Sequence, residues 1–99
     1  MPHFVVIRER SSGWNWSLPM RRQEKWDAHA AFMDALAAEG FVVAGGPLGG
    51  EDDAARVLHV VEAADPHAVE QRLADDPWTP MRLLDTLSIE PWTVLLGRL

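Results

Sequence analysis

The chain has 99 residues, 47% of them hydrophobic and 24% charged, a composition typical of one globular domain spanning residues 1–99. A formal net charge of −6 argues against nucleic-acid binding, which depends on clustered Lys and Arg, and the absence of cysteine excludes disulfides and thiolate chemistry. No apolar run approaches the ~20 residues needed to cross a bilayer. No signal-peptide layout is visible, so we expect a cytoplasmic protein that does not bind membranes.

The first part of the chain predicts a strand, a loop and a helix. Residues His3–Glu9 are rich in β-branched side chains, which favour a strand. Gly, Pro and polar residues interrupt Arg10–Arg22, which predicts a loop. Residues Gln23–Glu39 carry apolar positions at helical spacing, and Gly40 is placed to end that helix in a left-handed conformation.

The central part predicts a hairpin of two short strands. Phe41–Ala44 forms the first strand, and we expect the Gly- and Pro-rich segment Gly45–Gly50 to end it and to begin the connection. The alternative, a phosphate-binding loop, is disfavoured because the segment lacks the following Lys and Ser or Thr and leads into a strand. The next strand is Arg56–Glu62.

The last part predicts a helix and a strand. Asp65 as the N-cap and Pro66 in the first turn are typical of a helix start, and Pro77 prevents the helix from continuing. We expect Thr86–Leu96 to form the final strand, broken or bulged at Pro91.

The resulting order, β-α-β-β-α-β, predicts an α+β fold of the ferredoxin-like class. In this fold a four-stranded antiparallel sheet carries both helices on one face. The strands are apolar on both faces, since Val5 and Ile7 alternate with Phe4 and Val6. Because two helices cover only one face, we expect a homodimer whose sheets pack face to face.

His29 is the strongest indication of chemistry, because it lies on the apolar stripe of the first helix. An imidazole there needs hydrogen-bond partners, and the topology brings Asp75 and Asp76, at the end of the second helix, towards it. An imidazole oriented by a carboxylate is a common acid/base arrangement. A purely structural histidine and a simple Asp-Pro turn remain the alternatives.

Other polar and aromatic residues give weaker signals. His3, His59 and His67 show no metal-ligand spacing, so we expect no metal. Of the five tryptophans, Trp26 and Trp92 fit core positions. The loop residues Trp14 and Trp16 should cover a pocket or fill the dimer interface.

Four segments in register resemble the YciI-like (YCII-related) family. They are His29 within its helix, the run from Gly40 to Leu48, Asp75-Asp76-Pro77-Trp78, and Ile89-Glu90-Pro91-Trp92. The resemblance implies a ferredoxin-like domain that dimerises into an α+β barrel, with a candidate active site of His29 and Asp76. It also suggests lyase-type chemistry on small cyclic compounds.

Two functions follow for such a domain. The first is a cofactor-independent enzyme in which His29 transfers a proton and Asp76 orients its ring, giving elimination or isomerisation of a small organic compound. The second is a dimeric binding protein that holds a small molecule without turnover. In both, we expect the ligand to contact Trp14, Trp16, Asp75 and Trp78. An oxygen-using monooxygenase is suggested only by analogy with other dimeric barrels.

Overall fold

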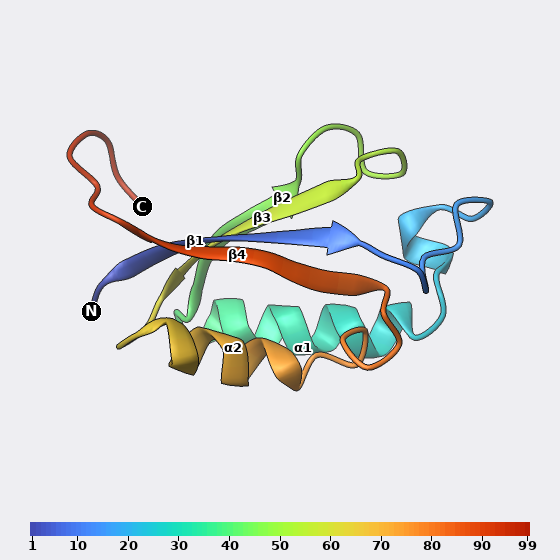
Figure 1. Cartoon of the computed structure of the whole chain (residues 1–99), viewed down its shortest axis with the longest axis horizontal. Coiled ribbons are helices and arrows are strands. Elements are labelled where there is room, and N and C mark those ends of the chain that lie inside the picture. Colours follow the sequence, from blue (N-terminus) through green and yellow to red (C-terminus); the bar gives the residue numbers. More distant parts are fainter.

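Two helices cover one face of a four-stranded antiparallel sheet (Figure 1). The strand order is β2-β3-β1-β4, so β1 and β3 are central and the other two strands form the edges. The computed structural model describes residues 1–99, and its elements are β1 (His3–Arg10), the short 3-10 helix η1 (Met20–Arg22), α1 (Trp26–Ala38), β2 (Val42–Pro47), β3 (Arg56–Glu62), α2 (Pro66–Ala74) and β4 (Leu84–Trp92). This confirms the ferredoxin-like α+β arrangement.

The helix boundaries follow local signals. The side chain of Asp65 accepts a hydrogen bond from the Ala68 N–H at 2.8 Å, which caps α2. Gly40, with φ of +85°, ends α1 in the left-handed conformation expected of it. The start of α1 was predicted too early, at Gln23. Lys25 has φ of 58°, so regular helix begins only at Trp26. Neither helix is long and apolar enough to cross a membrane.

The main core lies between the sheet and the helices. Phe4 and Val6 of β1 and Val61 of β3 point towards the helices. They pack with Leu36 of α1 and Leu73 of α2. The opposite face of the sheet carries no helix and is also apolar: it presents the half-buried side chains of Val5, Ile7 and Leu58 and the buried Val60.

Both edge strands differ from the predicted boundaries. β2 continues through Gly45 and Gly46 to Pro47, and β4 starts at Leu84 and ends at Trp92. An edge strand tolerates glycine and proline because its outer side needs no ladder hydrogen bond. For the same reason Pro91 does not break β4, where it pairs with Phe4.

The irregularity of β4 lies at Leu87, not at Pro91. Ile7 pairs with Ser88 and Arg8 pairs with Thr86, which leaves Leu87 as the extra residue of a bulge. In a regular strand, Leu84 and Ile89 would point to opposite faces because they are five residues apart. The bulge adds one residue between them, so both side chains face the helices. The prediction that Trp92 is a core residue was wrong, because it ends this edge strand with 39% of its surface exposed.

Truncating the core at Leu73 should test the packing. We expect Leu73→Ala to lower the free energy of unfolding by about 2–5 kcal/mol, because the side chain is fully enclosed and leaves a cavity. The matched control is Leu95→Ala, at an 86% exposed position, which should change it by less than about 0.5 kcal/mol. Urea denaturation measures both, and equal effects would contradict the described core.

Candidate active site

The site is centred on His29, which α1 holds against the sheet with only 8% of its surface exposed. Its imidazole stacks on the indole of Trp78, with ring centroids 3.8 Å apart and planes 7° from parallel. The Trp78 Nε1–H in turn donates to the Glu24 carbonyl at 2.7 Å, just before α1 begins. The turn after α2 and the start of α1 are therefore linked through one indole, which fixes the orientation of the imidazole.

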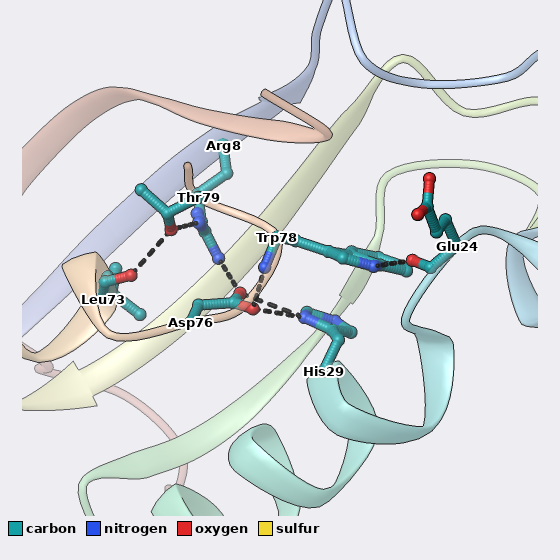
Figure 2. Close-up of polar contacts among 7 residues, drawn as sticks. All are labelled: Arg8, Glu24, His29, Leu73, Asp76, Trp78 and Thr79. Carbon is teal, nitrogen blue, oxygen red and sulfur yellow. Dashed lines mark hydrogen bonds and ion pairs between the residues drawn. The ribbon is translucent and has the colours of Figure 1, made fainter. Parts of the chain in front are cut away.

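Asp76 lies in the tight turn that follows α2, and its surface is 0% exposed. Its carboxylate accepts hydrogen bonds from His29 Nδ1, at 2.9 Å to Oδ1 and 3.0 Å to Oδ2, and from the Trp78 backbone N–H at 2.9 Å (Figure 2). Pro77 stops the helix here and leaves the Trp78 N–H free to donate back. The side chain thus caps its own turn while holding the histidine.

Arg8 provides the counter-charge for this carboxylate. Its Nη1 donates to Asp76 Oδ2 at 2.8 Å, and its Nη2 donates to Thr79 Oγ1 at 2.9 Å (Figure 2). The Thr79 hydroxyl then donates to the Leu73 carbonyl at 2.8 Å. Because Arg8 and Asp76 are both fully buried, each charge depends on the other for its compensation.

These contacts determine the charge of Asp76 and the tautomer of His29. Burial by itself raises the pKa of the Asp76 carboxyl, but the contacts with His29, Arg8 and the Trp78 N–H outweigh it, and the net pKa lies below the usual value. Asp76 is therefore ionised at neutral pH and can only accept hydrogen bonds. The proton of neutral His29 consequently lies on Nδ1, and Nε2 carries a free lone pair.

A cavity of about 370 Å³ lies beside His29, between α1, the loop after β1 and the edge strand β2. This volume is in the range of sites for small organic molecules. Three indoles line it, those of Trp14, Trp26 and Trp78. Asp76 does not reach the cavity, so His29 is the member of the pair that a bound molecule would meet.

The residues predicted from the sequence divide into two groups. His29 and Asp76 are brought into direct contact, and Trp14 and Trp78 line the cavity beside them. Trp16 and Asp75 do not line it: Trp16 is 54% exposed on the loop, and Asp75 is an exposed residue that ends α2. Half of the expected ligand contacts are therefore at the cavity.

Sequence reasoning missed several residues of the site. Arg8 lies an even number of residues from Phe4 and Val6, so the alternation of side chains along β1 already predicts that it points towards the helices. Arg10 shares that parity. It lines the cavity with its guanidinium 4.1 Å from the ring centroid of Trp14. His59 also lines the cavity, and the alternation that it shares with the buried Val57 and Val61 of β3 places it on the same face.

The described residues include no group of three or more His, Asp or Glu side chains that could hold a metal ion. The polar groups facing the cavity are instead imidazoles, guanidiniums and the carboxylates of Asp34 and Glu51. Such a set suits recognition of an organic molecule that combines an apolar ring with polar substituents.

A comparison with protein families matches residues 1–93 to the YCII-related domain. The chain belongs to this family. A comparison with curated proteins found no match. Among solved structures, the YCII-related domain is similar to 5-chloro-2-hydroxyhydroquinone dehydrochlorinase (TftG) from Burkholderia phenoliruptrix AC1100, in complex with 2,5-dihydroxybenzoquinone. The two share 24% identity and a TM-score of 0.66, over 91% of this chain and 93% of that one, which shows a common fold.

The burial of His59 should make the stability of this YCII-related domain depend on pH. Burial, followed by the charges of Arg8 and His29, lowers the pKa of His59 to about 4, while Asp76 opposes the shift. The unfolded chain, with a histidine pKa of about 6.5, therefore binds more protons between these values. The contribution of neutral His59 to the free energy of unfolding is therefore fully present above pH ~6.5 and is lost as the pH falls towards about 4.

We expect this loss to be of order 3 kcal/mol, as measured by denaturation at several pH values. The His59→Gln variant should lose correspondingly less over the same interval. His67→Gln, at an exposed position of α2, should follow the wild type. A His59→Gln profile as steep as that of the wild type would contradict the assignment.

Proposed function

We propose that this domain is a small-molecule enzyme in which His29 acts as the proton-transferring base and Asp76 as its orienting carboxylate. One observation carries the proposal: the fully buried Asp76 carboxylate lies 2.9 Å from His29 Nδ1, and His29 itself lines an aromatic cavity, so its other ring nitrogen is the one available to a bound molecule. This is the arrangement of a positioned general base.

The reaction that fits best is proton abstraction followed by elimination or isomerisation. His29 Nε2 would take a proton from carbon, and the electron pair released would form the new double bond as a leaving group departs. Asp76 would stabilise the imidazolium formed, and Arg8 would keep Asp76 ionised. The solved structure that this domain resembles is named a dehydrochlorinase, and dehydrochlorination is an elimination of this kind. We therefore place the substrate among small cyclic compounds.

No cofactor is needed for this chemistry. The proton acceptor and its supporting charges all come from the chain, and the chain contains no cysteine for thiolate attack. The proposed covalent change is confined to the substrate, with the proton passing through His29 to product or solvent.

Replacing His29 tests the proposal directly. With 5-chloro-2-hydroxyhydroquinone as the first substrate tried, followed by related halogenated ring compounds, we expect His29→Asn to lower kcat/KM by roughly 10²–10⁴-fold. Chloride release measures the rate. His67→Asn, at an exposed position, should leave it unchanged. Full turnover by His29→Asn would refute the base assignment.

The alternative is a binding protein without turnover, which the cavity's three indoles would also suit. In that case the ligand would quench indole fluorescence and be recovered unchanged after long incubation with the wild-type protein.

We also propose that two copies pack through the helix-free sheet face, forming a dimeric α+β barrel. Val5, Ile7 and Leu58 are only half-buried on this face, and burying them stabilises an interface. A second copy presents the same apolar surface and therefore matches it.

We expect a dimer at micromolar concentration by analytical ultracentrifugation, and a monomer for Leu58→Glu because the interface would bury an unpaired charge. Ala31→Glu, at an exposed position of α1, serves as the control and should remain dimeric. A monomeric wild type would overturn this proposal without affecting the base assignment.

A further inference from the structure

A second imidazole, His59, faces the same cavity and has no role in the chemistry proposed above. It lies in the middle of β3, pairs with Val6 of β1 and points to the helix side of the sheet, with 6% of its surface exposed. Its Nδ1 is completely buried and has no hydrogen-bond partner. A buried polar atom without a partner is uncommon and calls for an explanation.

Gly45 gives this ring its access to the cavity. The two residues face each other across the β2–β3 pair, and a Cβ at Gly45 would lie 2.6 Å from His59 Cδ2. Any larger side chain there would have to displace the imidazole. The glycine therefore makes room for the ring to lie against β2, at the wall of the cavity that both residues line.

The surroundings of His59 determine where its proton lies. Burial and the nearby charges hold the pKa at about 4, so the ring is neutral at pH 7 and carries one N–H. A buried N–H without an acceptor is rarer than a buried lone pair without a donor. Arg8, whose own Nε is also unpaired, is a nearby cation that further favours a lone pair on Nδ1. These conditions favour the tautomer of His59 that carries its proton on Nε2.

We propose that His59 donates its Nε2–H to an oxygen of the substrate, while His29 Nε2 accepts the proton from carbon. The two imidazoles thus have opposite polarity: Asp76 sets His29 as an acceptor, and the absence of any partner at Nδ1 sets His59 as a donor. A neutral N–H donor stabilises negative charge that develops on oxygen as a neighbouring carbon loses its proton.

This inference rests on the proposed function for its chemistry and narrows the substrate class. The compound should carry a carbonyl or phenolic oxygen conjugated to the reacting carbon. When His29 removes the proton, the electron pair left on that carbon can then delocalise to the oxygen held by His59. A purely hydrocarbon ligand would cover this donor without offering it an acceptor, which disfavours its binding.

The tautomer can be tested on the wild-type protein without any ligand. In a long-range ¹H–¹⁵N correlation spectrum at pH 7, we expect the Nε2–H pattern for His59 and the Nδ1–H pattern for neutral His29. Assignment follows from the loss of each signal set in His59→Gln and His29→Asn. A charged His59, or its Nδ1–H tautomer, would overturn the proposal.

The donor role can be tested by binding of 2,5-dihydroxybenzoquinone, followed by quenching of indole fluorescence. We expect His59→Leu to weaken binding by roughly 10- to 100-fold, as for loss of a hydrogen bond to a charged or strongly polar oxygen. His59→Gln, which retains an N–H donor at a similar position, should recover most of the affinity.

If both variants lose the same affinity, or if neither loses any, His59 only packs against the ligand without donating a hydrogen bond, and the proposal is overturned. Failure of the wild type to bind would overturn the substrate class. The His29→Asn variant separates this inference from the proposed function. If it retains turnover, the base assignment fails, whereas the difference between His59→Leu and His59→Gln still decides the donor role.

Discussion

The contact between the buried carboxylate of Asp76 and its donors is the interaction on which the rest of the structure depends. It joins β1 through Arg8, α1 through His29, and the turn after α2 through its own backbone. A lone carboxylate without solvent would be strongly unfavourable, and it persists because the guanidinium and the imidazole compensate it. The packing of both helices against the sheet and the orientation of the candidate base are therefore a single arrangement. A substitution that loosens one will also disturb the other.

The sequence was sufficient for the fold because its signals are local. The β-branched runs, the Asp65-Pro66 helix start and Gly40 each specify an element by themselves, and their order leaves few topologies. Element ends were less predictable. β2 runs through Gly45 and Gly46 because an edge strand tolerates glycine and because His59 leaves no space for a side chain at Gly45. The bulge at Leu87 depends on which side chains of β4 must face the core. Both are consequences of packing between distant segments.

The site was predictable in part for the same reason. His29 stands out as a polar residue on an apolar stripe, and Asp76 follows from the topology and the family resemblance. His59 could not be recognised in this way, since a histidine among β-branched residues is ordinary. Its importance comes from what surrounds it: a glycine opposite, an arginine on the next strand, and no partner for Nδ1. Trp16 and Asp75 illustrate the opposite error, because nearness in sequence to site residues does not bring a side chain into a cavity.

The stacking of His29 on Trp78 has a further consequence. The negative face of an indole attracts a cation, and such a contact contributes about 0.5–2 kcal/mol depending on its exposure to water. At a centroid distance of 3.8 Å, Trp78 lies against the ring that becomes positive when His29 accepts a proton. The indole therefore interacts more favourably with the imidazolium than with the imidazole. In the proposed reaction, the aromatic wall of the cavity would thus share with Asp76 the stabilisation of the positive charge on His29.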